Sequence, residues 1–337
     1  MENKDILADI KNLNIKFNLR QGTINAVNDV SFFIEKRKII GLVGESGCGK
    51  SITSKSLLRI ESPAKICSGE IFFNSIQHGK IALQNLHPHG SMIRSIRWRE
   101  ISMIFQEPMS SFGPMHTIGN QISESIRLHF KVSKKESLDR TLEGLKSVGM
   151  PRPDKIMKQY PHQLSGGMRQ RAMIAMALCC RPNLLIADEP TTALDVSTEA
   201  QILDLLFELR KEMNMSILFI THNLGVIGKM ADYVIVMYLG KIVEQAGIYE
   251  LFKRPKHPYT HALLNSIPRL NKNGRVKKLA ILEGSIPDPY DYPKGCTFHT
   301  RCPRFMPGIC NVLIPESINL QNNVKVACHL YTSSQKS

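Results

Sequence analysis

The sequence predicts an α/β protein whose main domain is built on a parallel sheet. Short apolar runs in "IIGLVG" (39–44), "NLLIADEP" and "SILFITH" are typical of buried strands. Helical patterns lie between them, and this alternation is typical of a parallel sheet covered by helices. The composition, with 42% hydrophobic and 22% charged residues, is that of a globular chain.

The first hundred residues are expected to be rich in strands. Residues 5 to about 40 are predicted to form short strands with turns at "RQGT" and "EKRK". The apolar run "IIGLVG" enters a glycine turn, and a helix is expected from Lys50 to about Arg59. The segment 68–105 is mixed and ends in "ISMIF", a further predicted strand.

The middle of the chain is predicted to be mainly helical. Residues 117–149 show helical spacing of apolar positions, and 196–213 form an amphipathic pattern. A helix that starts after Gly167 is expected to end near Cys180, because Pro182 disfavours its continuation. The α/β domain is therefore predicted to cover residues 5–250.

Residues 251–337 are expected to form a second, loop-rich unit. Residues 253–278 contain eight Lys or Arg and no Asp or Glu, within a chain of formal net charge +15. Such a run indicates a solvated linker, an anionic membrane surface or nucleic acid. The sequence has no apolar run long enough to cross a bilayer and no export signal, so the chain is expected to stay in the cytosol unless a partner carries it to a membrane.

The stretch "GESGCGKS" has the spacing of a P-loop and lies between a predicted strand and a predicted helix. Glycines let backbone N–H groups surround phosphates, and the helix N-terminus adds positive charge. In this motif Lys50 reaches the β- and γ-phosphates, and the Ser51 hydroxyl ligates Mg²⁺. The predicted ATP-binding residues of the loop are Gly44, Glu45, Ser46, Gly47, Cys48, Gly49, Lys50, Ser51 and Ile52.

The apolar run "LLIADEP" ends in two carboxylates. A strand that ends in Asp188 would place this side chain where it can hold Mg²⁺ through water, and Glu189 can polarise an attacking water as a general base. A lone Asp-Glu pair most often lies in a surface turn. Four apolar residues before it, in a chain with a P-loop, favour the catalytic interpretation.

A second phosphate-binding pattern occurs at "LSGGM", residues 164–168. Small residues at a helix N-terminus suit a bound phosphate. The alternative is an ordinary capped helix, since serine is common at the N-cap. The predicted residues are Leu164, Ser165, Gly166, Gly167 and Met168.

The order of "GESGCGKS", "LSGGM", "LLIADEP", "ALD" and "THN" resembles the ATP-binding cassette (ABC) family over about residues 5–250. The resemblance implies a P-loop NTPase cassette with a RecA-like core, an N-terminal antiparallel β subdomain and a helical signature subdomain at about 107–167. It implies that Gln106 is the Q-loop glutamine, Asp195 the D-loop aspartate and His222 the switch histidine that contacts the γ-phosphate. Phe17 is the candidate for stacking on adenine.

The same resemblance implies a mechanism and partners. Two cassettes meet head to tail, the "LSGGM" residues of one cover the γ-phosphate bound by the other, and hydrolysis opens the pair. Mg²⁺ would be held by Ser51, Gln106 and Asp188, and catalysis would depend on Glu189, His222 and Gln106. The implied partners are a paralogous second cassette or a second copy, two membrane permease subunits and an extracytoplasmic substrate-binding protein, at the cytoplasmic face of the cell membrane. No nucleic acid is expected.

The tail resembles the C-terminal extension of the oligopeptide and dipeptide permease ATPases at "KHPYTHALLNSIP" and "GCTFHTRCP". Its cysteines, Cys296, Cys302, Cys310 and Cys328, could hold a [4Fe–4S] cluster or a tetrahedral zinc ion. Their spacing matches neither a ferredoxin run nor common zinc sites, so composition leaves both metals and the absence of metal open. The resemblance implies the iron–sulfur cluster.

The sequence does not decide which cargo is transported, because the cassette does not contact it. Import of di- or oligopeptides is the preferred function, and nickel chelates or oligosaccharides are alternatives. A soluble ABC ATPase that acts on nucleic acid or ribosomes, and a structural or redox-sensing iron–sulfur protein, are alternatives of other classes. Soluble ABC ATPases of this kind carry a long coiled coil or two cassettes in one chain, and the sequence shows neither. A structural or redox-sensing protein would not need Lys50, Asp188, Glu189 and His222, which are all present.

Overall fold

The computed structural model describes residues 5–107, 111–192, 194–267 and 284–335. Residues 268–278 of the basic stretch singled out above therefore lie outside the described residues. The chain divides into two compact units, each made of several segments. Among the described residues, the first unit contains residues 5–8, 34–38 and those in 72–220, and the second contains residues 9–33, 39–71 and those in 221–335.

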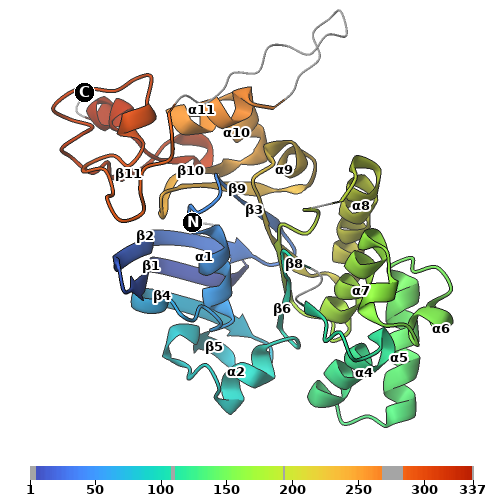
Figure 1. The fold of residues 1–337 in the computed structure, drawn as a ribbon. Helices are drawn as coiled ribbons and strands as arrows, with labels where there is room; N and C mark the ends of the chain where they lie inside the picture. The colour runs from blue at the N-terminus through green and yellow to red at the C-terminus, as the bar shows by residue number, and fades with distance from the viewer. Residues whose placement is uncertain (1–4, 108–110, 193, 268–283, 336–337) are drawn as a thin grey trace, which may run out of the picture. The chain divides into compact units, whose positions relative to one another are not determined.

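The first unit contains a parallel sheet and a group of helices (Figure 1). Its strands β6, β7 and β8 pair in parallel, with Ile101 opposite Leu184 and Leu184 opposite Ser216. Every residue of these three strands is buried, which is why they have no polar alternation in the sequence. The elements of this unit are β5 (Gly79–Ala82), α2 (Ser91–Ile96), β6 (Ile101–Ile104), α4 (Ile118–His129), α5 (Lys134–Ser147), α6 (Pro153–Ile156), α7 (Gly166–Leu178), β7 (Leu184–Asp188), α8 (Val196–Met213) and β8 (Ser216–Thr221).

The helical pattern predicted at 117–149 consists of two helices, α4 and α5. Helix α4 ends before Phe130, whose backbone is extended, and Ser133 begins α5 by accepting a hydrogen bond from the Glu136 N–H at 3.1 Å. The cap satisfies a backbone donor that a new helix would otherwise leave without a partner. Helices α4, α5 and α7 pack on one another, as Figure 1 shows.

The second unit contains a mixed sheet in the order β11-β12-β10-β9-β3. Strand β9 is parallel to β3, whereas β10, β12 and β11 are added in antiparallel fashion. Helix α10 packs on β9 and β10 (Figure 1). The elements are β3 (Ile39–Val43), α1 (Lys50–Leu57), α9 (Leu224–Met230), β9 (Tyr233–Tyr238), β10 (Lys241–Gly247), α10 (Ile248–Lys253), α11 (Pro258–Asn265), β11 (Ser317–Asn319) and β12 (Lys325–Ala327).

Two long strands precede β3, where short ones were predicted. Strands β1 (Ile6–Leu19), β2 (Gly22–Glu35) and β4 (Lys65–Ser75) lie in the order β2-β1-β4 in a separate sheet, and the end of β4 pairs with β5 in antiparallel fashion. The turn predicted at 20–23 lies between β1 and β2, and both strands are longer than predicted. Buried and partly buried positions alternate over residues 30–35, at the end of β2.

The tail is less irregular than its sequence predicts. Strands β11 and β12 extend the sheet from β10, with Val326 opposite Glu244 and Ile318 opposite Val326. Three-residue strands in a proline-rich segment carry little periodicity, which is why the sequence pattern missed them. The 3₁₀ helices in the described residues are Leu83–Asn85, Pro161–Gln163, His299–Arg301, Gln321–Asn323 and His329–Gln335.

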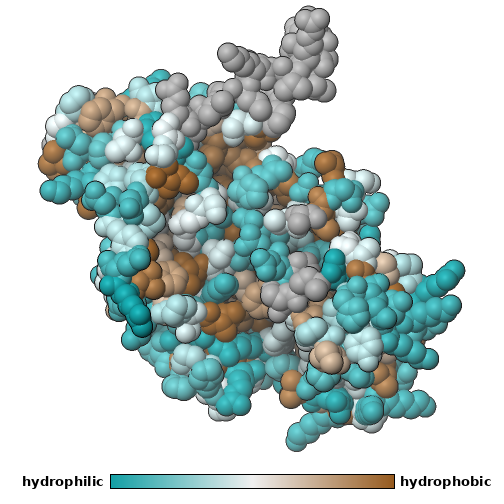
Figure 2. Space-filling model, in the orientation of Figure 1, coloured by the Kyte–Doolittle hydropathy of each residue, from teal (hydrophilic) through white to brown (hydrophobic). Residues whose placement is uncertain are grey.

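In the described part of the chain, no helix combines the length and the apolar character that crossing a membrane requires. The helices of the first unit present a mainly hydrophilic surface in the view of Figure 2. Of the four cysteines outside the tail, Cys48 and Cys180 are buried and Cys179 is partly buried. Cys67 is exposed.

Candidate functional site

The P-loop connects β3 to α1 in the second unit, in the strand–turn–helix context that its spacing predicts. Gly49 has a φ of 98°, and a Cβ there would lie 2.3 Å from the backbone oxygen of Ala26. Only glycine fits this turn without moving the backbone. Gly49 also precedes the first residue of α1, so no side chain competes with a ligand for the first N–H groups of this helix.

The Lys50 ammonium group is buried and is held by the loop itself. Its Nζ atom donates to the backbone oxygens of Gly44 at 2.8 Å and Glu45 at 3.0 Å. The Cys48 sulfur lies 3.7 Å from the same Nζ atom. Burial raises the pKa of the Cys48 thiol, although Lys50 acts in the opposite direction. The Cys48 side chain therefore packs inside the loop, and Ser46 and Gly47 are the exposed residues at its tip.

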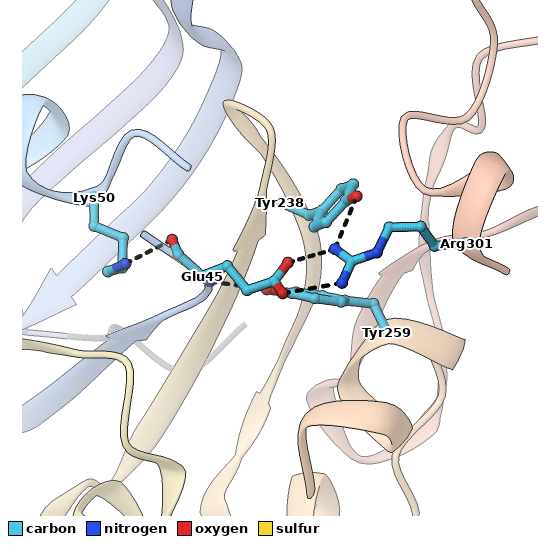
Figure 3. Close-up of polar contacts among 5 residues, drawn as sticks. All are labelled: Glu45, Lys50, Tyr238, Tyr259 and Arg301. Atoms are coloured by element: carbon cyan, nitrogen blue, oxygen red, sulfur yellow. Dashed lines mark hydrogen bonds and ion pairs between the residues drawn. The ribbon is translucent and has the colours of Figure 1, made fainter. Parts of the chain in front are cut away.

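The carboxylate, the N–H and the carbonyl of Glu45 each have a hydrogen-bond partner (Figure 3). Two of these partners, Arg301 and Tyr259, come from the C-terminal part of the unit. The Arg301 guanidinium group donates to both carboxylate oxygens, at 2.7 and 3.2 Å. The Glu45 N–H donates to the Tyr259 hydroxyl at 2.9 Å, and the Glu45 carbonyl accepts from Lys50. Neither Arg301 nor Tyr259 was predicted. They lie in the two tail motifs quoted above, but no spacing signal connects them to a loop more than two hundred residues away.

Asp188 is the last residue of β7 in the first unit and is buried, and Glu189 follows it directly. Glu189 has a φ of 47°, a conformation unusual for a residue with a side chain. Its carboxylate accepts hydrogen bonds from the Gln106 amide and the Thr192 hydroxyl, each at 3.1 Å. The structure thus brings together two of the three predicted catalytic residues, Gln106 and Glu189.

The "LSGGM" residues form the start of α7 in the same unit. Ser165 is the N-cap, and its side chain accepts from the Met168 N–H at 3.4 Å. A Cβ on Gly167 would lie 2.9 Å from a methyl carbon of Thr198, so glycine permits close packing of α7 on α8. Asp195 caps α8 by accepting from the N–H groups of Ser197 and Thr198. Hydrogen bonds from Thr198 lower the pKa of Asp195.

The other predicted residues lie in the second unit. His222 is exposed and directly follows β8, and Phe17 is half-buried on β1. The P-loop residues belong to this unit, whereas Gln106, Asp188, Glu189 and the "LSGGM" residues belong to the first. The role of each predicted residue remains a prediction.

The structure does not confirm the predicted metal site of the tail. Among the described residues, no three His, Cys, Asp or Glu side chains are arranged to hold a metal ion. Cys296, Cys310 and Cys328 are buried, and Cys302 is partly buried. Burial raises the pKa of the Cys328 thiol to about 11, with smaller contributions from the other three cysteines. The described thiols are therefore not arranged as a metal site.

Two protein families match the chain. Residues 27–192 match the ABC transporter family, and residues 243–310 match the oligopeptide/dipeptide transporter C-terminal region. The probable peptide ABC transporter ATP-binding protein y4tR of Sinorhizobium fredii is 44% identical, over 96% of this chain and 95% of its own. The oligopeptide transport ATP-binding protein AppD of Bacillus subtilis is 46% identical, over 96% of this chain and 97% of its own.

Solved structures show the same fold. The dimeric, post-hydrolysis structure of the ATP-binding cassette MJ0796, bound to ADP and Pi, has a TM-score of 0.64 and 25% sequence identity. The similarity covers 72% of this chain and 99% of the cassette. The predicted α/β cassette fold is confirmed. The P-loop connects a strand to a helix, Gln106 contacts Glu189, and the similarity to these relatives extends along nearly the whole chain. The protein therefore belongs to the ATP-binding proteins of ABC transporters, in the group that carries the oligopeptide/dipeptide transporter C-terminal region.

Proposed function

We propose that this chain is the ATP-hydrolysing subunit of an importer for di- or oligopeptides. The observation that carries the proposal is the similarity to peptide transport ATP-binding proteins, which extends through the C-terminal region as well as the cassette. Generic cassettes share the nucleotide machinery but not this region. Residues 5–250 serve as the cassette and 251–337 as the extension.

ATP binds at the P-loop in this proposal. The N–H groups at the start of α1 surround the phosphates, and Lys50 exchanges its two backbone partners for phosphate oxygens. Ser51, Gln106 and Asp188 hold Mg²⁺, and Phe17 stacks on the adenine. The contacts of Lys50 support this assignment, because its ammonium group is already aimed at the inside of the loop.

A second cassette completes the site. Ser165, Gly166 and Gly167 of one cassette face the γ-phosphate held by the other, where the N-terminus of α7 offers N–H donors and positive partial charge. Glu189 orients and deprotonates the attacking water, and Gln106 donates a hydrogen bond to its carboxylate. His222 contacts the γ-phosphate. The pair of cassettes thus has two states: ATP favours the closed state, and hydrolysis favours the open one.

The remaining partners follow from the transport function. We propose that the cassette pairs with a paralogous cassette or a second copy of itself. The pair binds two membrane permease subunits, which receive peptides from an extracytoplasmic binding protein. The chain would then lie at the cytoplasmic face of the membrane without crossing it.

Reconstitution tests this function. The chain, its permease subunits and its second cassette are assembled in proteoliposomes with the binding protein, and ATP hydrolysis is measured with added di- and oligopeptides. Peptide-stimulated hydrolysis with peptide uptake is expected. Stimulation by nickel chelates or oligosaccharides alone would assign another cargo, and co-purification with RNA instead of permeases would contradict the transport function.

We further propose that the tail holds a [4Fe–4S] cluster at Cys296, Cys302, Cys310 and Cys328. The chemistry of the donor set supports this proposal, because iron–sulfur clusters are held by cysteine thiolates and the tail carries four cysteines. The cluster would crosslink a segment with few strands of its own. Anaerobically purified protein should show an absorbance band near 400 nm that C328S loses and C67S keeps. A colourless protein that contains no iron would contradict the proposal.

A further inference from the structure

We propose that Arg301 and Tyr259 are positioning residues for ATP binding, because they hold the P-loop through Glu45. The contacts lie within one unit of the structure, between the nucleotide loop and the C-terminal segments (Figure 3). This role goes beyond the proposed function, which assigns the tail no part in nucleotide binding.

Glu45 occupies a position that the P-loop pattern leaves variable, yet three of its groups are held by contacts. Its carboxylate forms a bidentate ion pair with Arg301, its N–H donates to Tyr259 and its carbonyl accepts from Lys50. Bidentate pairs between a guanidinium group and a carboxylate fix orientation as well as distance. The backbone of the loop at Glu45 therefore has little freedom.

The two positioning residues are themselves rigidly supported. The Arg301 side chain is only 4% exposed, and its guanidinium group contacts the Tyr238 hydroxyl at 3.4 Å. Tyr259 is fully buried, with its ring centroid 4.7 Å from that of Tyr238 and 5.3 Å from that of Phe298. Phe298 and Tyr238 also pack edge to face at 5.2 Å. This aromatic cluster joins α11, β9 and the cysteine-bearing segment into one support for the loop.

The consequence concerns affinity, not the chemical step. Lys50 must leave the carbonyls of Gly44 and Glu45 when phosphates arrive. A loop whose backbone is already fixed loses less conformational entropy when it closes around the phosphates, so binding is stronger. Loss of the Arg301–Glu45 pair should weaken ATP binding while the rate at saturating ATP stays close to that of the unmodified protein.

The full-length chain provides the first test. R301M should raise the dissociation constant for ATP about 5- to 20-fold, and Y259F, which removes the acceptor of the Glu45 N–H, should raise it about 3- to 10-fold. R301K keeps the charge but not the bidentate geometry, and it should recover only part of the affinity. R304A and Y331F are matched controls in the same tail, and both should bind ATP normally.

The assembled transporter provides the second test. R301M should raise KM for ATP by a factor similar to that of the dissociation constant and change kcat less than about twofold. A general structural defect in the tail would instead lower kcat and thermal stability, without the selective rise in KM for ATP. Equal losses in kcat and in kcat/KM would overturn the positioning role.

A double-mutant cycle identifies the path of the effect. If Arg301 acts through Glu45, then R301M should change ATP affinity little once E45Q is present. Multiplicative effects of the two substitutions would overturn the proposal. E45Q is nearly isosteric and lies in a loop, so it reports on the same pair even if R301M does not fold.

This inference rests on the P-loop being the ATP site, and one variant separates the two. K50A should abolish ATP binding. Normal binding by K50A would refute the proposed site, whereas loss of binding in K50A with normal binding in R301M, Y259F and E45Q would refute only the positioning role.

Discussion

The Gln106 side-chain amide donates a hydrogen bond to the Glu189 carboxylate at 3.1 Å, across 83 positions of the sequence. The pair lies in one unit, with Glu189 at the end of β7 and Gln106 two residues after β6, the adjacent parallel strand. The carboxyl ends of parallel strands meet at one edge of a sheet, where ligands of open α/β folds bind. This relationship positions the carboxylate proposed as the general base.

The first prediction concerns that carboxylate. E189Q keeps the size of the side chain and one acceptor oxygen but removes its charge and basicity. Phosphate release by the assembled complex should fall about 10²- to 10⁴-fold, whereas ATP binding should change less than about threefold. The exposed Glu212 on α8 supplies the control E212Q, which should retain its activity. Full turnover by E189Q would remove Glu189 from the catalytic role.

The second prediction separates the two roles of Ser165. S165A should lose about 1 kcal/mol of stability as an N-cap substitution and should also lose most ATP hydrolysis. S165D restores the cap, but it places a negative charge where the proposal puts the γ-phosphate of the other cassette. S165D should therefore recover thermal stability and not activity.

Ser133 provides the matched control for this substitution, because it caps α5 through the same kind of hydrogen bond. S133A should lose similar stability, measured by thermal unfolding, and should hydrolyse ATP normally. Recovery of hydrolysis in S165D would show that Ser165 is only a helix cap.

The third prediction concerns the turn at Gly49. G49A forces a side chain into a left-handed backbone conformation and toward the Ala26 carbonyl, so the loop must move. ATP affinity of the full chain, measured by titration calorimetry, should fall more than about tenfold. G79A is the control, because Gly79 also has a positive φ of 69° but a Cβ there would meet no atom within 4 Å. Equal effects of both substitutions on ATP binding would contradict this account.

The fourth prediction concerns pH. His257 is buried, its Nδ1 atom accepts a hydrogen bond from the Tyr259 N–H at 3.1 Å, and burial lowers its pKa from 6.5 to about 3. Below pH 6.5 the unfolded chain binds a proton that the folded chain does not, so this contribution to stability is present above pH 6.5 and is lost as pH falls toward 3.

Between pH 7 and 5.5 the contribution to the free energy of unfolding should decrease by about 1 kcal/mol. H257N keeps an acceptor for the same N–H without a titrating group, so its stability should depend less on pH in this interval. Urea unfolding followed by circular dichroism at both pH values measures the difference. Identical pH dependence in H257N and the unmodified chain would contradict the assignment.

The sequence by itself determined the cassette fold and the positions of its motifs. Strand β3, the glycine turn and α1 were predictable because buried parallel strands are continuous apolar runs and P-loops have a fixed spacing. The same holds for β7 with Asp188 and for α7 with Ser165. Local patterns carry this information, since each motif occupies neighbouring residues.

Tertiary structure alone decided which distant residues meet. The hydrogen bond from Gln106 to Glu189 follows from strand order, and the contacts of Glu45 with Arg301 and Tyr259 span 256 and 214 positions. The strands β11 and β12 likewise form only because β10 offers an edge for them to pair with. Such contacts depend on chain reversal and packing, and they leave no periodicity in the sequence from which they could be predicted.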